Sequence, residues 1–348
     1  MKEVYLENIS KRFDREEAVK NLSLKVDRGS MISLLGPSGC GKSTTLKIIA
    51  GLVAPEEGRV YIGGDSVNHL PTQKRGAVIV FQDHRLFPHM TVGGNVEFGL
   101  RMQGMDKKLR QKKVREMLGF VGLQDHGGKY PGEISGGQQQ RVAIARSLVV
   151  DPKVLLLDEP FSNLDQRLKE EMRSFIVDIQ RKLKITTILV THDKEDALIT
   201  SKKIGVMFNG ELKQYGTPEE LYENPASLEV ARFFGEVNKI PVKEREEEVL
   251  VTDLGRFPGL FPDKEMGNVE VLLLRPEGVV LHKHDPAKKA LFSEGKILRR
   301  VYAGEKTYYR VVVKDLEIMA STMGKGVFGE GEEVRVQVLE KSLMVCKS

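Results

Sequence analysis

The segment GPSGCGKS at residues 36–43 constrains this chain more than any other part of its sequence. It fits the pattern G-x-x-x-x-G-K-[ST], in which glycines let the backbone turn so tightly that successive N–H groups face phosphate oxygens. The helix that follows adds the positive end of its dipole. We expect Lys42 to reach the β- and γ-phosphates of a nucleotide, and the Ser43 hydroxyl to bind Mg²⁺.

Both flanks of this loop support that interpretation over a chance glycine-rich turn. The apolar run Met31–Leu35 is typical of a strand buried on both faces, and a helix is expected from Lys42 to Ala50, where Gly51 stops it. No redox role is expected for the loop cysteine, because no partner cysteine is nearby. The candidate nucleotide-binding residues of the loop are Gly36, Ser38, Gly39, Cys40, Gly41, Lys42, Ser43 and Thr44.

Strand-like and helix-like segments alternate up to about residue 235. Before the loop, short strands are expected around Val4–Ile9 and Leu22–Val26. Further buried strands are predicted at Val78–Phe81, Val154–Leu157, Thr187–Val190 and Ile204–Phe208, and helices at 107–121, 137–149, 164–183 and 194–199. This alternation predicts an α/β phosphate-loop fold with a parallel sheet covered on both faces. A helical subdomain is expected over about 86–150.

A second domain is predicted from residue 236 to residue 348. Its runs are short, alternate between apolar and polar residues, and are broken by glycine and proline, which is typical of a small all-β, barrel-like fold. The expected strands are Glu248–Thr252, Val269–Leu274, Gly295–Tyr302, Lys306–Val313 and Glu333–Leu339.

The composition fits a cytosolic protein. Of 348 residues, 40% are hydrophobic and 30% charged, and no stretch approaches the roughly 18 apolar residues of a membrane-spanning helix. The N-terminus lacks the apolar core of a secretory signal. The two cysteines, Cys40 and Cys346, are too few for a disulfide framework. The net charge of +5 is mild, and the basic residues at 107–115 alternate with apolar ones at helical spacing. We therefore expect a solvated helix face there and no nucleic-acid partner.

Two predicted strands end in polar residues that suit phosphate chemistry. Asp158 follows the run Val154–Leu157 and is positioned to hold Mg²⁺, while Glu159 suits polarisation of the water that attacks a γ-phosphate. His192 follows the run Thr187–Val190. Because parallel strands end at one edge of a sheet, these groups are expected to meet at the nucleotide.

The segment Ile134–Arg141 (ISGGQQQR) carries a specific resemblance. It is similar to the L-S-G-G-Q signature of the nucleotide-binding subunits of ABC transporters, with isoleucine in place of the usual leucine. In that family the loop opens a helix whose N–H groups bind the γ-phosphate held by a second subunit. The resemblance implies that Ser135, Gly137 and Gln138 bind nucleotide.

The resemblance covers residues 1–235 and assigns four further sites. It implies that Phe13 stacks on adenine, where a half-buried core aromatic is the alternative. It implies that Gln82 contacts Mg²⁺ and the attacking water, making Ser43, Gln82 and Asp158 the expected metal ligands. It also implies that Ser162–Asp165 crosses a dimer interface and that His192 senses the γ-phosphate. The implied catalytic residues are Glu159, His192 and Gln82.

Finer features resemble importers. The run Leu86–Val92 looks like the segment that docks onto a membrane permease, and LRPE at 274–277 is similar to the C-terminal TOBE domain of that subclass. The resemblance implies an ATP-hydrolysing head-to-tail homodimer with ATP and Mg²⁺, peripheral on the inner face of the cell membrane. A periplasmic or extracellular solute-binding protein is an indirect partner.

Other functions remain as alternatives. A soluble ABC ATPase of DNA repair or translation is disfavoured because this chain has neither two cassettes nor a long inserted coil. A phosphate-loop kinase or GTPase has no place for Ile134–Arg141. A non-catalytic nucleotide sensor is disfavoured because Lys42, Asp158, Glu159 and His192 are all intact. For the solute, Tyr130–Pro131 and 160–165 look like ferric-iron importers, whereas 235–238 looks more like sulfate importers. An inorganic ion such as ferric iron is favoured, with sulfate, polyamine and sugar left open.

Overall fold

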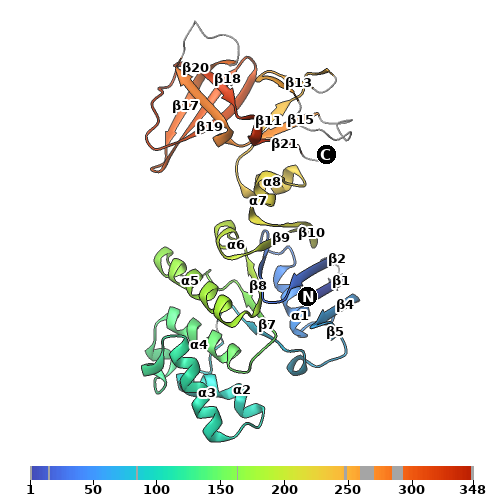
Figure 1. Ribbon diagram of the computed structural model, residues 1–348, viewed down its shortest axis with the longest axis vertical. Helices are drawn as coiled ribbons and strands as arrows, with labels where there is room; N and C mark the ends of the chain where they lie inside the picture. The colour runs from blue at the N-terminus through green and yellow to red at the C-terminus, as the bar shows by residue number, and fades with distance from the viewer. Residues whose placement is uncertain are drawn as a thin grey trace. The chain divides into compact units, whose positions relative to one another are not determined.

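The computed structural model describes residues 2–14, 16–83, 85–162, 164–246, 249–258, 270–283 and 293–345 (Figure 1). Contacts divide the chain into two compact units, Met1–Pro218 and Glu219–Ser348. Among the described residues, none of the helices combines the length and apolar character that a membrane span requires.

A six-stranded sheet forms the centre of the first unit, with strand order β10-β9-β3-β8-β7-β6. Its strands are β3 (Met31–Leu35), β6 (Ala77–Val80), β7 (Val154–Asp158), β8 (Thr186–Thr191), β9 (Lys203–Phe208) and β10 (Glu211–Gly216). All neighbours pair in parallel except β10, which lies antiparallel to β9 at the edge. The predicted parallel sheet is confirmed, with β10 as an addition that the sequence analysis did not identify.

Alternate residues of β7 enter different hydrophobic cores. Val154 and Leu156 pack with apolar residues of α1 (Lys42–Ala50), whereas Leu155 and Leu157 pack with residues of the helical layer on the other face. The remaining helices of this unit are α2 (Val92–Met102), α3 (Lys107–Phe120), α4 (Gly136–Leu148), α5 (Gln166–Leu183) and α6 (Lys194–Thr200). Burial on both faces explains why the strand reads as an unbroken apolar run.

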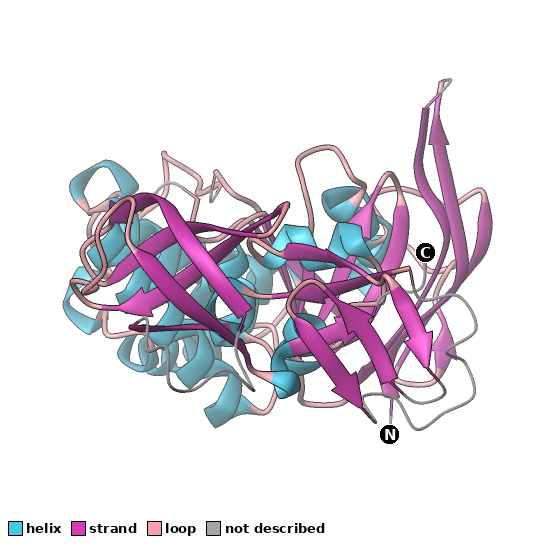
Figure 2. Ribbon diagram, turned by 90° about the horizontal axis from the view of Figure 1, so that it is seen from above, coloured by secondary structure: helices cyan, strands magenta, loops and turns pink. Residues whose placement is uncertain are grey.

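The helices α2, α3 and α4 lie together at one end of this unit (Figure 1), and most of the helical ribbon is in the left half of the second view (Figure 2). The helix predicted at 107–121 is found as α3, and α2 is separated from it because the chain turns at 103–106, where Gly104 has φ 72°. Short 3₁₀ turns at Thr72–Lys74, Gln124–His126 and Pro131–Glu133 complete the connections.

An antiparallel sheet of order β2-β1-β4-β5 adds a second layer to the first unit. Its strands are β1 (Lys2–Phe13), β2 (Glu16–Asp27), β4 (Glu57–Ile62) and β5 (Asp65–Ser66). The predicted apolar positions at Val4–Ile9 and Leu22–Val26 are its buried face. They belong to strands that are longer than predicted, because β1 and β2 pair almost along their whole length.

The second unit is built mainly from antiparallel strands. One sheet has the order β16-β20-β17-β18-β19, and two three-stranded sheets have the orders β11-β15-β21 and β12-β13-β14. The bounds are β11 (Asn238–Pro241), β12 (Glu244–Glu246), β13 (Val249–Thr252), β14 (Gly255–Pro258), β15 (Val271–Leu274), β16 (Val279–Lys283), β17 (Ser293–Tyr302), β18 (Lys306–Val313), β19 (Leu316–Met323), β20 (Glu333–Val338) and β21 (Leu343–Val345). Two 3₁₀ turns lie at Pro276–Gly278 and Glu340–Ser342.

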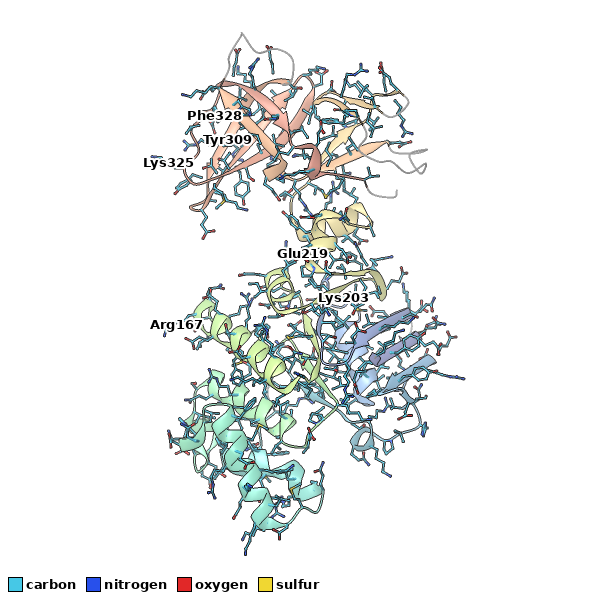
Figure 3. All side chains as sticks on the ribbon, in the orientation of Figure 1. Arg167, Lys203, Glu219, Tyr309, Lys325 and Phe328 are labelled. Atoms are coloured by element: carbon cyan, nitrogen blue, oxygen red, sulfur yellow. The ribbon has the colours of Figure 1, made fainter. Side chains whose placement is uncertain are left out.

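The five-stranded sheet curls on itself, since its edge strands β16 and β19 pack against each other. Tyr309 and Phe328 meet edge to face inside it, with ring centroids 6.1 Å apart (Figure 3). The predicted fold class, an α/β phosphate-loop unit with a helical layer followed by a barrel-like β unit, is confirmed. The beginnings of two predicted strands, at residues 248 and 269, and Cys346 fall outside the described residues.

The contact-based division falls at residue 218, earlier than the boundary expected at residue 235. The helices α7 (Pro218–Glu223) and α8 (Leu228–Phe234) therefore group with the strands of the second unit, apart from the first residue of α7. The reason lies in the buried guanidinium of Arg275, which donates to the carbonyl oxygens of Ala231 (2.9 Å) and Tyr222 (3.2 Å). Ala231 also packs against the apolar side chains of β15 and β21.

Candidate functional site

The predicted phosphate loop connects the end of β3 to the start of α1 in close contact with neighbouring backbone. Gly39 and Gly41 have φ 81° and 98°, a conformation that other residues adopt only with strain. A Cβ at Gly41 would lie 2.1 Å from the carbonyl oxygen of Ala18, and one at Gly36 would lie 2.2 Å from that of Met207. Glycine is therefore required at both positions, and the loop forms a cradle that fits phosphate groups.

Lys42 lies inside this cradle rather than in solvent. It is 4% exposed, and its Nζ donates to the carbonyl oxygens of Gly36 (2.8 Å) and Pro37 (2.7 Å). Ser38 and Gly39 are exposed at the tip of the loop, and Thr44 is half-buried in the first turn of α1. A buried cation surrounded by main-chain atoms is suited to bind the oxygens of a nucleoside phosphate.

Cys40 is buried beneath the same loop. Burial raises the pKa of its thiol, and the opposing effect of Lys42, whose Nζ lies 3.7 Å from Sγ, is smaller. A thiol with a raised pKa is a poor nucleophile. The residue therefore contributes to the packing of the loop, in line with the expectation that it has no redox role.

Ser43 and Asp158 are joined directly. The Ser43 hydroxyl donates to Asp158 Oδ1 over 2.7 Å, although the two residues are far apart in sequence. A hydroxyl and a carboxylate at this distance, beside a phosphate cradle, are the oxygen donors that Mg²⁺ prefers. Gln82, the third expected ligand, follows β6 and is exposed. The residues present thus fit a magnesium ion at this edge of the sheet.

Glu159 and His192 form a second pair at the same edge. The distance from His192 Nδ1 to Glu159 Oε2 is 3.2 Å, and the side chains are 52% and 21% exposed respectively. The backbone N–H of Glu159 donates to the carbonyl oxygen of Val190 (3.0 Å), and Glu159 has φ 48°. A left-handed conformation is uncommon for a residue other than glycine and recurs at functional sites. A cavity of about 170 Å³ lies beside the pair.

Phe13 is at the end of β1 and is 47% exposed, so it does not belong to the core. Its ring lies 5.3 Å from the ammonium of Lys11. An exposed aromatic ring is available to stack on a base, and that role for Phe13 stays a prediction.

The predicted signature opens α4. Ser135 is the N-cap of this helix, its hydroxyl accepting from the Gln138 N–H (3.3 Å), while Gln138 Oε1 accepts from the Ser135 N–H (2.9 Å). Gly137 has open space where a side chain would be, and Ile134 is buried. Among the described residues, no hydrogen bond or ion pair joins residues 135–138 to the phosphate loop. The helix end is therefore available to a ligand held elsewhere.

The predicted interface segment at residues 162–165 leads into α5. The Ser162 hydroxyl donates to the carbonyl oxygen of Glu159 (3.0 Å), and the Asp165 carboxylate caps the helix by accepting from the Leu168 N–H (3.0 Å). Asn163 lies outside the described residues. The segment is thus bonded to the backbone of the predicted catalytic carboxylate.

The predicted docking segment at residues 86–92 is held together by one buried amide. Asn95 is fully buried, and its side chain bonds the N–H and the carbonyl oxygen of Phe87 as well as the carbonyl oxygens of Met90 and Thr91. Phe87 also packs on Phe98, with ring centroids 4.7 Å apart. The segment is a preformed loop, of which Pro88 and His89 are the exposed residues between Phe87 and Met90.

Comparison with known proteins identifies two family models that match this chain. The family model described as "ABC transporter" matches residues 19–162, and that described as "TOBE domain" matches residues 272–345. A curated relative from Rhizobium etli, named "Fe(3+) ions import ATP-binding protein FbpC", is 44% identical over 88% of this chain and 87% of its own length. A protein of the same name from Escherichia coli O157:H7 is 44% identical over 81% of this chain and 80% of its own length. Another from Agrobacterium fabrum is 48% identical over 71% of this chain and 71% of its own length.

Two solved structures each match more than half of the chain. The cbiO1 protein of Clostridium perfringens, described as part of the ABC transporter complex cbiONQ, is 31% identical with a TM-score of 0.59, covering 62% of this chain and 89% of its own. The ATP-binding cassette MJ0796, described as a dimeric post-hydrolysis state bound to ADP and Pi, is 34% identical with a TM-score of 0.56, covering 62% of this chain and 98% of its own.

One group of residues beside the site was not predicted. On α5, Lys169 bonds Asp193 and lies 3.2 Å from Asp196, while Arg173 bonds Asp196 (2.6 Å) and Glu195 (3.1 Å). The sequence does contain a signal, since the cations are four residues apart and Asp193 and Asp196 are three apart, so each set shares a helix face. The sequence does not show that the basic face of α5 pairs with the acidic residues at the start of α6.

This group generates a pH-dependent contribution to stability. Burial acts to raise the pKa of Asp193, but hydrogen bonds from Lys169 and from the Glu195 N–H outweigh it, so that the pKa is lowered. A carboxyl with a lowered pKa stabilises the fold fully above the unfolded value of about 3.9, and this contribution is lost as the pH falls through the folded pKa. We expect the wild type to exceed Asp193→Asn in free energy of unfolding by a constant amount between about pH 5 and pH 8.

Below about pH 4 that difference should shrink toward zero. Urea unfolding of both proteins across this range measures it, and Asp193→Asn is a conservative variant because asparagine also caps helices well. A difference that grows as the pH is lowered would contradict the sign of the pKa shift.

Proposed function

Because this chain belongs to the ABC transporter family, we propose that it powers uptake of ferric iron through a membrane permease. Within that family it is an ATP-hydrolysing subunit of the importer type with a TOBE domain. The observation that carries the proposal is the meeting of two residue pairs at one sheet edge, Ser43 with Asp158 and Glu159 with His192. The names of the curated relatives favour ferric iron over the sulfate, polyamine and sugar alternatives.

In the proposed mechanism the phosphate loop binds the nucleotide. Lys42 exchanges its two carbonyl partners for phosphate oxygens, while the N–H groups from Gly39 to Thr44 donate to the same phosphates. Ser43, Asp158 and Gln82 are the residues that would hold Mg²⁺, and the ion would supply positive charge that offsets the phosphate charge. Phe13 stacks on the base, for which its exposed ring is available.

Hydrolysis needs a base beside the γ-phosphate, and Glu159 is the residue proposed for it. Its carboxylate is mostly shielded, and its backbone is fixed by the hydrogen bond to Val190. His192 orients the carboxylate through the 3.2 Å contact, and its exposed ring is available to bind the γ-phosphate. A carboxylate so held accepts a proton from the attacking water, a contribution of about 10²–10⁴ in rate.

The site is completed by a second copy of the chain. The open helix end at Ser135, Gly137 and Gln138 has no bonded contact with its own phosphate loop, which favours binding to nucleotide held by a partner. Two copies related by a two-fold axis then share two sites. ATP stabilises the closed dimer because these contacts exist only in that state, and hydrolysis removes them.

The proposed membrane contact is the preformed loop at residues 86–92, which transmits closure to the permease through α2. The chain is then peripheral on the cytoplasmic face of the membrane. A solute-binding protein on the far side delivers the ion to the permease and does not touch this subunit.

The role of Glu159 predicts a variant that binds ATP without turnover. Glu159→Gln keeps the shape of the side chain beside His192 but removes the base, so kcat should fall by about 10²-fold or more while ATP binding is retained. Phosphate release and equilibrium binding of ATP measure the two quantities. Turnover at the wild-type rate would exclude this role for Glu159.

The shared site predicts that ATP promotes dimers. In the Glu159→Gln background, sedimentation velocity at saturating Mg-ATP should show dimers, and Ser135→Arg added to it should restore monomers by blocking the helix end. Equilibrium binding of ATP to the double variant is the control. Because this variant keeps the phosphate loop, it should still bind ATP, so the loss of dimers cannot be due to a loss of nucleotide. Monomeric Glu159→Gln protein at saturating Mg-ATP would count against a shared site.

The solute is tested by transport. Membrane vesicles containing this chain with the permease and binding protein encoded beside it should accumulate ferric iron when ATP is supplied, and vesicles carrying Lys42→Ala should not. Sulfate, a polyamine and a sugar are the comparison solutes. Uptake of one of these in place of iron would replace the proposed substrate but leave the ATPase mechanism intact.

A further inference from the structure

We propose that Lys169 of α5 is a positioning residue for His192: it ties the backbone around the histidine to the helix that follows the interface segment, and so sets where the imidazole lies relative to Glu159. This inference rests on the proposed role of His192 and assigns a new role to a residue that touches neither nucleotide nor metal. The contacts around His192 carry it.

His192 lies in a tight turn whose two ends are held. The Asp193 N–H donates to Thr191 Oγ1 (3.0 Å), so the hydroxyl of the residue before the histidine binds the backbone of the residue after it. The Thr191 hydroxyl in turn donates to Asp196 Oδ2 (3.1 Å), and Asp193 Oδ1 accepts from the Glu195 N–H (2.8 Å). Within the turn, the backbone of His192 therefore has little freedom.

These contacts fix the turn to α6, and the pairing of Thr191 with Leu35 fixes its start to the sheet. Lys169 adds a link to α5, since its Nζ bonds Asp193 Oδ2 and lies 3.2 Å from Asp196 Oδ1. Its side chain is 14% exposed, and Asp196 is 3% exposed. Shielding from water strengthens such a pair and restricts its geometry.

A neighbouring ion pair on the same helix shows what an unshielded contact looks like. Arg167 pairs with Glu171, but its side chain is 88% exposed and projects outward from α5 (Figure 3). A pair of that kind has almost no influence on geometry. Lys169, two residues further on, faces the turn instead.

Arg173 makes the role of Lys169 separable from the stability of the fold. Its guanidinium bonds Asp196 through Nε (2.7 Å) and Glu195 through Nη1 (3.1 Å), which keeps α6 attached to α5 without Lys169. Removal of the Lys169 ammonium should therefore release Asp193 Oδ2, and with it the link between the turn and α5, while leaving the two helices together.

The helix that carries Lys169 begins beside the other half of the pair. Asp165 caps α5, and Ser162, just before it, donates to the carbonyl oxygen of Glu159. Glu159 and His192 are thus both connected to α5. Glu159 is connected through the bond from Ser162 to its backbone, and His192 through the bond from Lys169 to Asp193.

The test uses the full-length chain and steady-state ATP hydrolysis. Lys169→Met keeps the aliphatic stem and removes the charge, Lys169→Arg restores the charge, and Lys112→Met makes the same exchange in an exposed pair with Glu116 on α3. We expect Lys169→Met to lower kcat by about tenfold with KM for ATP changed less than about twofold, because orientation and not binding is lost. Lys169→Arg should recover most of kcat, and Lys112→Met should match the wild type.

Thermal unfolding of the same proteins separates positioning from stability, since Lys169→Met should remain fully folded at the assay temperature. A kcat within about twofold of the wild type for Lys169→Met, or no recovery in Lys169→Arg, would overturn the inference. His192→Ala is measured alongside. If the wild type hydrolyses no ATP, the proposed function fails; if His192→Ala keeps the wild-type kcat, the role of His192 fails and this inference with it.

Discussion

The in-register parallel pairing of β3, β8 and β7 is the constraint on which the rest of the site depends. Leu35 pairs with Thr191 and Asp158 pairs with Val190, so the three strands end almost level. The phosphate loop, the histidine turn and the two carboxylates each begin where a strand ends. A shift of one residue in either pairing would turn the strand-end side chains to the opposite face and separate Ser43 from Asp158.

The same sheet explains where the signature helix lies. Because both faces of β7 are apolar, each needs a covering layer, and α4 supplies part of the second one through residues such as Val142 and Ile144. Burial of this helix fixes its axis, and among the described residues no hydrogen bond or ion pair joins its capped end at Ser135 to the phosphate loop. The burial that stabilises the sheet thereby also fixes the helix end that, in the proposed dimer, binds nucleotide held by the partner.

The sequence predicts those parts of the site that depend on the direction of the chain. Parallel strands place their carboxyl ends on one edge, so Asp158, Glu159 and His192 could be placed together without coordinates. It does not predict contacts between helices distant in sequence, and Lys169 with Asp193 is such a contact, since each face alone resembles a solvated surface. Nor does it predict that α8 joins the second unit, because that grouping depends on the buried hydrogen bonds of Arg275, which lies far along the chain.

The backbone of Glu159 has a left-handed conformation that residues other than glycine disfavour. A left-handed backbone at a residue other than glycine costs of order 1 kcal/mol or more, and it persists only where the surroundings determine it. Here its N–H is bound by Val190, its carbonyl by Ser162 and its carboxylate by His192. Those three partners belong to β8, the segment before α5, and the turn that Lys169 holds. The conformation of the carboxylate that we propose as the base is therefore set by the same elements that carry the proposed interface segment, so in the proposed dimer the interface and the Glu159–His192 pair are joined by direct hydrogen bonds.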